Sequence, residues 1–301
     1  MSIINLKITY NNAKRGNVMA VRTDLALEAN NAIDIETHKG IKIYERKCED
    51  INIVRMDVIN SAGEKALGKP AGTYITMEVP QLMSDDENYH RKISKALANE
   101  LRDMIKAVYD EKNKTPGILV AGLGNMEATP DSLGPKAVSN LMITRHIAET
   151  EDDKFAIISA ISPGVMAQTG METSEIISGI INRTAPDVLI VIDSLAARKL
   201  SRLTATIQIS NTGIEPGSGV GNNRKAINKE TMGIPVIAIG VPTVVDASTL
   251  VSDLNPEVEE KASESQFYKS MYVTSKDIDA LIKRISYTLS EAVNICMSSV
   301  I

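Results

Sequence analysis

The sequence predicts an α/β protein with a mostly parallel sheet flanked by helices and a second, β-rich sheet formed by the N-terminal part. Three observations support this class. From residue 117 onward, runs that are nearly continuous in apolar residues recur, as expected for strands covered on both faces. Segments with apolar residues at three- and four-residue spacing lie between these runs. Residues 41–80 instead alternate apolar and polar side chains, which is typical of strands with one face in water.

The elements before residue 117 are an arm, the alternating strands and one helix. Residues 1–40 are polar and weakly patterned, so we interpret them as a loosely attached N-terminal arm. The alternating strands occupy 41–60 and 73–80, where β-branched side chains are frequent. A helix is predicted over 88–111 because its apolar residues share one face: Ile93, Leu97, Leu101, Met104, Ile105 and Val108.

After residue 117, strands and helices alternate along the chain. The predicted strands are 117–122, 155–162, 188–193, 204–210 and 235–240. The predicted helices are 132–148, 173–184 and 275–298. We expect Thr173 or Ser174 to cap the second of these helices and Ser275 to cap the third. Residues 252–266 are acidic and poor in periodicity, so we expect a surface excursion there.

Composition narrows the class of protein further. With 301 residues and 43% hydrophobic content, the chain can build one large domain or two small ones. A formal net charge of −5 gives no electrostatic footprint for duplex DNA or an anionic membrane. We expect Cys48 and Cys296 to be small buried apolar residues in a reducing, cytoplasm-like compartment. The first residues lack the apolar core of a signal peptide, and no apolar run is long enough to span a bilayer.

Acidic residues mark the ends of three predicted strands, where sites form in open α/β sheets. Asp131 lies in the glycine-rich turn GLGNMEATPDSLGP, residues 122–135. Asp193 ends an apolar run, and Asp246 ends the loop after 235–240. Each aspartate has a simpler alternative, because each can cap a following helix. The turn itself lacks the third glycine of a dinucleotide fingerprint, so it is a weak sign of a cofactor.

The inventory of histidines and cysteines argues against other hydrolytic schemes. His90 and His146 belong to predicted helix bodies, and His38 lies in the N-terminal arm. None of them follows a strand, which argues against a Ser–His–Asp or Cys–His arrangement. No His/Cys cluster has the spacing of a zinc site. Two carboxylates on neighbouring strand ends remain, and such a pair can share a proton, activate water against a peptide carbonyl and protonate the leaving nitrogen.

Five long segments resemble the germination proteases of spore-forming bacteria. They are VRTDLALEA (21–29), GLGNMEATPDSLGP (122–135), ISPGVMAQTGMET (161–173), the segment 187–228 from DVLIVIDSLAARKLSRL to NNRKAIN, and MGIPVIAIGVPTVVDA (232–247). The closing stretch MYVTSKDIDALI (271–282) fits as well. The chain departs from the family's usual length between about 250 and 270, where many members carry a longer insert.

The resemblance implies an atypical aspartic endopeptidase that acts on small acid-soluble spore proteins in the cytoplasm of the spore core. It implies a homotetramer with no cofactor, no metal, no direct nucleic-acid partner and no membrane partner. The aspartates proposed as catalytic in the family fall on Asp131 and Asp193. The family is made as a zymogen, so we expect residues 1–24 to be a propeptide and residues 25–301 to be a single α/β peptidase domain. The substrate-like segment predicts self-cleavage between Asp24 and Leu25.

An acidic recognition sequence requires cationic partners on the enzyme. Arg198, Lys199 and Arg202 follow Asp193, and Arg224 follows the glycine loop 213–221. We expect them to bind acidic side chains of the substrate, and a solvated basic face is the alternative. The glycine loop can bring backbone N–H groups close to a substrate.

The sequence leaves two rival functions open. The first is a metal-dependent endopeptidase of the hydrogenase-maturation type, which shares the glycine turn but adds a histidine ligand. The second is a small-molecule binding module that uses the turn at 122–125 and the loop at 213–221 to hold phosphate. The acidic residues in these loops argue against an anionic ligand.

Overall fold

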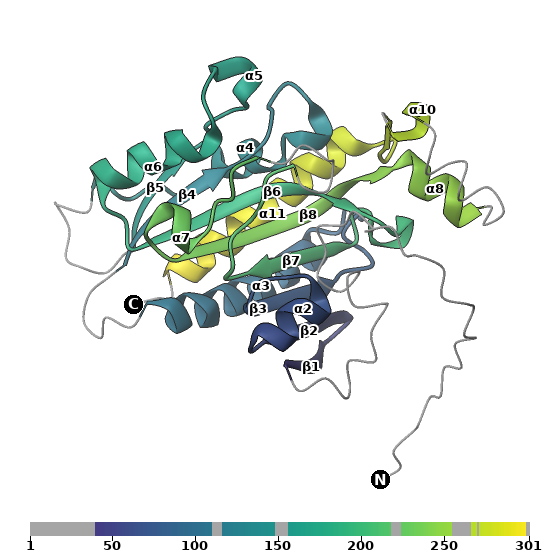
Figure 1. Cartoon of the computed structure of the whole chain (residues 1–301), viewed down its shortest axis with the longest axis horizontal. Coiled ribbons are helices and arrows are strands. Elements are labelled where there is room, and N and C mark those ends of the chain that lie inside the picture. Colours follow the sequence, from purple (N-terminus) through teal and green to yellow (C-terminus); the bar gives the residue numbers. More distant parts are fainter. Residues whose placement is uncertain are drawn as a thin grey trace, which may run out of the picture.

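The structure, a computed structural model, describes residues 40–109, 116–147, 156–217, 224–254, 266–269 and 271–298. Their strands form one nine-stranded sheet in the order β1-β2-β3-β7-β8-β6-β4-β5, with β9 paired to β8 (Figure 1). The strands are β1 Ile41–Cys48, β2 Ile51–Val58, β3 Gly72–Glu78, β4 Gly117–Gly122, β5 Ile157–Ile161, β6 Val188–Ala197, β7 Thr206–Ser210, β8 Val236–Asp246 and β9 Tyr272–Val273. The predicted α/β class, a sheet flanked by helices, is confirmed.

The N-terminal strands extend this sheet and do not form a second one, which corrects one detail of the prediction. β3 pairs antiparallel with β7 from Tyr74 opposite Ser210 to Glu78 opposite Thr206. β7 in turn pairs antiparallel with β8, whereas β8, β6, β4 and β5 are parallel neighbours. Alternating polarity reports which face of a strand is covered, but it does not report which strand lies at its edge.

Helices cover both faces of the parallel part of the sheet. The helices of the described residues are α2 Ser61–Leu67, α3 Glu87–Val108, α4 Leu133–Val138, α5 Met166–Thr169, α6 Thr173–Thr184, α7 Lys229–Met232, α8 Ala247–Leu254, α10 Gln266–Lys269 and α11 Ile278–Ser298, with 3₁₀ turns η3 Thr129–Asp131 and η4 Leu200–Arg202. α3, α4 and α11 lie on one face, and α6 and α7 lie on the other (Figure 1). Among the described residues, no helix is both long and apolar enough to cross a bilayer.

β6 is the central strand, and its sequence explains the double cover. Ile190 and Ile192 join the core beneath α3 and α11, whereas Leu189 and Val191 join the core beneath α6 and α7. All four side chains are completely buried. A continuous apolar run is therefore required here, because neither face of the strand meets water.

Three predicted helices have the expected position, and one is shorter than predicted. α6 has the predicted bounds, but Glu172 is its N-cap, in a capping box with Glu175, in place of Thr173 or Ser174. α3 and α11 lie within a few residues of the predicted ranges.

The helix predicted over 132–148 ends at Val138. The following segment lies along β5 instead, where the backbone N–H groups of Thr144 and Arg145 donate to the carbonyl oxygen of Ile158. Tertiary hydrogen bonds thus override the helical periodicity of this segment. The prediction that Cys48 is buried was wrong, because this residue is exposed at the end of the edge strand β1. Cys296 is buried in α11 as expected.

Gly134 allows the start of α4 to lie directly against the sheet. A Cβ atom at this position would lie 2.4 Å from the carbonyl oxygens of both Ile192 and Leu123. We expect Gly134→Ala to lower the free energy of unfolding by about 1–3 kcal/mol, because rigid backbone must shift to admit the methyl group.

A matched control is Gly179→Ala, which places its Cβ in open space in the middle of α6. This variant should gain about 0.4–1 kcal/mol, because alanine restricts the unfolded chain. Urea unfolding measures both changes, and equal effects at the two positions would contradict the close approach at Gly134.

Candidate active site

The loop after β4 folds back onto the neighbouring strand β6. The backbone N–H of Leu123 donates to the carbonyl oxygen of Ile192 at 2.8 Å. Gly124 has φ 114°, and a Cβ there would lie 2.0 Å from the carbonyl oxygen of Asp131. Only glycine combines this backbone conformation with such a close approach. The glycines of the turn therefore fold the loop and place Asp131 beside the end of β6.

Asp131 closes this loop and does not cap the helix that follows. Its Oδ2 accepts a hydrogen bond from the backbone N–H of Asn125 at 2.8 Å, while Ser132 is the N-cap residue of α4. Burial raises the pKa of Asp131 above its ordinary value, although the Asn125 N–H and the positive charge of Arg224 act in the opposite direction. The loop thus holds a carboxyl group whose ionised form is disfavoured.

Asp193 lies within β6 and not after its end. β6 continues to Ala197 and β8 to Asp246, so the predictions of 188–193 and 235–240 were too short. The two strands remain paired beyond the ends of their neighbours, up to Ala197 opposite Val245. The Asp193 residue is only 7% exposed, and its Oδ1 accepts a hydrogen bond from the backbone N–H of Ser194 at 2.8 Å.

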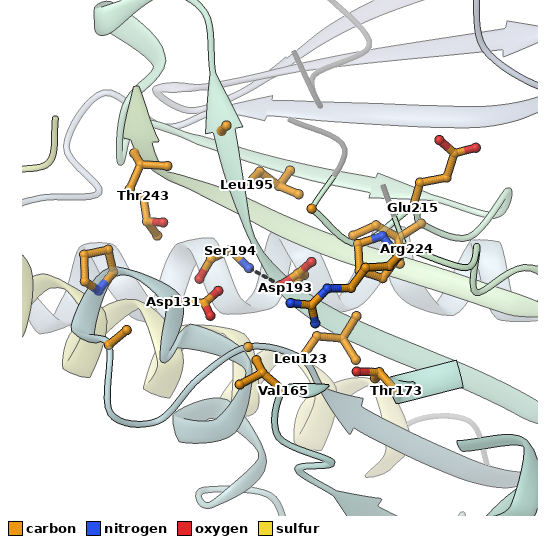
Figure 2. A pocket seen from close by; sticks show the side chains of 18 of the residues that line it. Leu123, Asp131, Val165, Thr173, Asp193, Ser194, Leu195, Glu215, Arg224 and Thr243 are labelled. Atoms are coloured by element: carbon orange, nitrogen blue, oxygen red, sulfur yellow. Dashed lines mark hydrogen bonds between the residues drawn. The ribbon is translucent and has the colours of Figure 1, made fainter. Parts of the chain in front are cut away.

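One cavity of about 560 Å³ brings the two aspartates together. Figure 2 shows Asp131 and Asp193 along the wall of this cavity, with Ser194 between them in the view and the side chain of Arg224 reaching in beside Asp193. Thr243 from β8 and Glu215 from the loop after β7 line the same space. Asp131 and Asp193 are 62 positions apart in sequence (193 − 131) and line one cavity because β4 and β6 are parallel neighbours.

The loop after β5 is bound to the loop after β4. The side-chain amide of Gln168, at α5, donates to the Oδ1 of Asn125 at 2.9 Å. Gly164 and Val165, which precede α5, line the cavity. The loops after β4 and β5 therefore form one side of the site together.

The predicted basic residues do not share one position. Arg224 lines the cavity, whereas Arg198, Lys199 and Arg202 are not among its lining residues. Arg202 lies in η4, and its Nη2 is 3.7 Å from the Oε1 of Glu78 in β3. The predicted processing site Asp24–Leu25 and the histidine His38 lie outside the described residues.

Asp246 has the helix-capping role that was its simpler alternative. It ends β8, and its Oδ1 accepts a hydrogen bond from the backbone N–H of Ser248, in the first turn of α8, at 2.8 Å. Asp246 does not line the cavity. Of the three strand-end aspartates, the described structure therefore brings two into one site.

Sequence reasoning missed Ser194, Thr243 and Glu215 as lining residues. Ser194 could have been found, because it follows Asp193 directly. Thr243 carries no such signal, since it stands in a run of valines within β8. In the part of the chain that the structure describes, no group of three or more His, Cys, Asp or Glu side chains is arranged to hold a metal ion.

The chain is similar to germination proteases over most of its length. A family model described as germination protease matches residues 19–258. A germination protease from Caldanaerobacter subterraneus subsp. tengcongensis is 44% identical over 93% of this chain and 95% of the relative. The corresponding protein from Clostridium acetobutylicum is 40% identical over 92% and 95%, and that from Bacillus cytotoxicus is 47% identical over 78% and 65%.

A solved structure, the NiFe hydrogenase maturation protease HycI from Thermococcus kodakarensis, aligns with 64% of this chain and 97% of its own. The sequence identity is 15% and the TM-score is 0.33. A TM-score this low does not establish a shared fold.

The raised pKa of Asp131 predicts how stability depends on pH. Stability from such a group is present below its unfolded pKa and is lost as the pH rises through the folded pKa. Asp131→Asn avoids that loss, and its amide oxygen can still accept from Asn125. We therefore expect a higher free energy of unfolding than the parent at neutral pH, with the gain shrinking as the pH falls toward about 4.

Urea unfolding across this pH range measures the difference between variant and parent. Asp246→Asn is the control, because aspartate and asparagine cap helices about equally well and little change in stability is expected. A lower stability of Asp131→Asn at neutral pH would show that ionised Asp131 is held favourably.

Proposed function

The chain belongs to the germination protease family, and from this membership we propose that it is an endopeptidase that initiates the degradation of small acid-soluble spore proteins during germination. The observation that carries the chemistry is that Asp131 and Asp193 line one cavity. The chain also has a substrate-like segment of its own, VRTDLALEA, within its first thirty residues. The enzyme acts in the cytoplasm of the spore core.

The mechanism is of an atypical aspartic type. Burial raises the pKa of Asp131, which favours keeping a proton on this carboxyl while Asp193 lines the same cavity. The ionised carboxylate takes a proton from water as the water oxygen adds to the peptide carbonyl carbon. The protonated carboxyl then gives its proton to the leaving nitrogen as the C–N bond breaks.

Arg224 is the first candidate to bind acidic side chains of the substrate. It lines the cavity, and its guanidinium group can hold a carboxylate in a bidentate manner. Arg198, Lys199 and Arg202 lie along the chain after β6, so they reach only substrate residues further from the scissile bond. This division separates Arg224, in the cavity, from the three basic residues outside its lining.

The enzyme is made as a zymogen and assembles as a homotetramer. Residues 1–24 form a propeptide, and self-cleavage between Asp24 and Leu25 releases the peptidase domain 25–301. The segment around this bond has an acidic residue before the cut and alanine and glutamate after it, which resembles the proposed substrates. Processing and substrate cleavage thus use one specificity.

A metal-dependent endopeptidase of the hydrogenase-maturation type is the second candidate, and it is not favoured. The relatives found over most of the chain are germination proteases. Among the described residues the extra histidine ligand also lacks a match, because neither His90 nor His146 lines the cavity. His90 instead donates from Nε2 to the carbonyl oxygen of Ser84, and its Nδ1 bonds to the hydroxyl of Thr288 in α11.

Replacing either aspartate by asparagine should remove catalysis and keep the fold. We expect Asp131→Asn and Asp193→Asn each to lower the rate of peptide cleavage by at least about 10²–10⁴-fold, because the pair loses its shared proton. A fluorogenic peptide spanning residues 21–29 reports the rate, and circular dichroism reports the fold.

The control for this pair is Asp246→Asn, which changes an aspartate at the end of β8 outside the cavity lining and should keep full activity. A chelator should leave the parent rate unchanged. Full activity in either aspartate variant would contradict the aspartic mechanism. Inhibition by the chelator that is reversed when metal is added would favour the second candidate.

Self-processing should produce a chain whose first residue is Leu25. Mass spectrometry and N-terminal sequencing of the matured protein identify the new terminus, and Asp193→Asn should stay at full length. Processing of that variant when mixed with active enzyme would show that the bond itself is accessible. A mature chain that begins elsewhere, with the Asp24–Leu25 bond intact, removes the proposed cleavage site.

A further inference from the structure

A β-bulge lies in the wall of the cavity, where β6 and β8 run side by side. Leu195 pairs with Pro242 and Ala196 pairs with Val244, so Thr243 has no counterpart on β6. The extra residue is fixed from the other side, because the hydroxyl of Thr274 donates to the carbonyl oxygen of Thr243 at 2.7 Å. Bulges of this kind re-aim a side chain and are frequent beside active sites.

The bulge places a buried hydroxyl in the wall of the cavity. Thr243 is 1% exposed and lines the cavity, yet its Oγ1 has no hydrogen-bond partner among the described residues. The Oγ of Ser194, on the adjacent strand, is likewise buried, lines the same space and lacks a partner there. Buried hydroxyl groups normally have a partner, so two such groups in one cavity require an explanation.

Packing alone does not explain the hydroxyl of Thr243. Its neighbours on β8 include Val241, Val244 and Val245, so this strand uses valine where a β-branched side chain only has to fill space. Valine has nearly the shape of threonine and would leave no polar atom unsatisfied. The chain instead places a hydroxyl at the bulged position in the cavity wall.

The two hydroxyls line the same cavity as the proposed catalytic carboxyls. Successive side chains of β6 point to opposite faces, so Ser194 is directed away from Asp193, and η3, which ends at Asp131, packs against both β6 and β8. Figure 2 shows Thr243 and Ser194 on the same side of the cavity as Asp131. A peptide carbonyl group that is attacked by water between the aspartates would therefore meet hydroxyl donors from these two strands.

We propose that the hydroxyls of Thr243 and Ser194 donate hydrogen bonds to the carbonyl oxygen of the scissile peptide and stabilise the oxyanion that forms when water adds. This inference rests on the proposed endopeptidase function. When the water oxygen bonds to the carbonyl carbon, the π electrons move to the carbonyl oxygen, and its negative charge is held by the two O–H groups. The hydroxyls give up no proton, and the oxyanion collapses as the C–N bond breaks and the nitrogen takes its proton from the carboxyl pair.

Neutral donors suit this position better than cations. Arg224 already acts to lower the pKa of Asp131, and a second cation at the position of Thr243 or Ser194 would lower it further and favour loss of the shared proton. Hydroxyl groups bind the oxyanion without competing for the carboxylates in this way. They also contribute most when the charge develops, so they act on kcat more than on KM.

The test compares Thr243→Val with Thr243→Ser. The first keeps the shape and removes the hydroxyl, whereas the second keeps the hydroxyl and removes the methyl group. We expect Thr243→Val to lower kcat for the peptide of residues 21–29 by roughly 10²-fold with KM nearly unchanged, and Thr243→Ser to keep most of kcat. Each full-length variant is first processed in trans by immobilised parent enzyme, so that all are compared in the same form.

Stability separates the proposed role from a structural one. Thr243→Val should be at least as stable as the parent in urea, because it removes a buried hydroxyl without a partner. Ser194→Ala should lower kcat in the same direction. A parent-like kcat in Thr243→Val overturns the proposal, and so does an equal loss of kcat in the Val and Ser variants together with a loss of stability.

Asp193→Asn, assayed in parallel, distinguishes failure of the inference from failure of the proposed function. If Asp193→Asn is inactive and Thr243→Val is fully active, the hydroxyl role falls and the aspartic mechanism stands. If Asp193→Asn is fully active, the aspartic mechanism falls and the oxyanion role falls with it.

Discussion

The site depends on the way the loop after β4 lies against β6. One backbone hydrogen bond, from Leu123 to Ile192, continues the strand pairing for one residue past the end of β4. Gly134 and Gly124 then let the chain pass so close to other backbone atoms that a side chain at either position would clash with them. Without this contact, Asp131 would lie on a loop above the sheet, and no cavity would join it to Asp193.

The rest of the sheet holds this contact in place. The hydroxyl of Thr129 in η3 donates to Asp279 in α11 at 2.8 Å, which ties the loop to the longest helix of the C-terminal region. α11 covers the same face of the sheet as α3, where the core is aliphatic and fully buried. A loop anchored at both ends can keep a partly desolvated carboxyl group in place, whereas a free loop would turn it toward water.

The sequence predicted which two aspartates come to one cavity better than it predicted the strands around them. The apolar run before Asp193 and the glycine turn before Asp131 each have a local signature, and parallel strands bring such positions to one edge. The extension of β6 to Ala197 has no comparable signature, because it depends on pairing with a β8 that is also longer than its apolar run. The bulge at Thr243 cannot be predicted from local sequence for the same reason, because it is a shift in the pairing register of two strands.

Other errors in the sequence-based predictions also came from contacts between segments that are distant in the sequence. The pattern over 132–148 is helical, but hydrogen bonds between Thr144 and β5 end the helix early. Cys48 is a residue type that is usually buried, yet it sits on the edge strand β1, whose side chains are mostly exposed. The joining of the N-terminal strands to β7 likewise depends on contacts between segments more than 130 residues apart, as for Tyr74 opposite Ser210. Local pattern does not encode such contacts.

Four residues with features that cost stability line one cavity, although other buried polar atoms without a partner lie elsewhere in the described residues. Asp131 has a raised pKa, and the hydroxyls of Ser194 and Thr243 and the Nε of Arg224 are buried without a hydrogen-bond partner among the described residues. Each of these features lowers stability, and all four residues line the cavity. A sheet selected for stability alone would carry valine or asparagine at such positions. Polar groups that the fold leaves unsatisfied in a single cavity are available to a ligand, and the proposed peptide substrate would supply both a carbonyl oxygen for the donors and a carbon for water activated by the two aspartates.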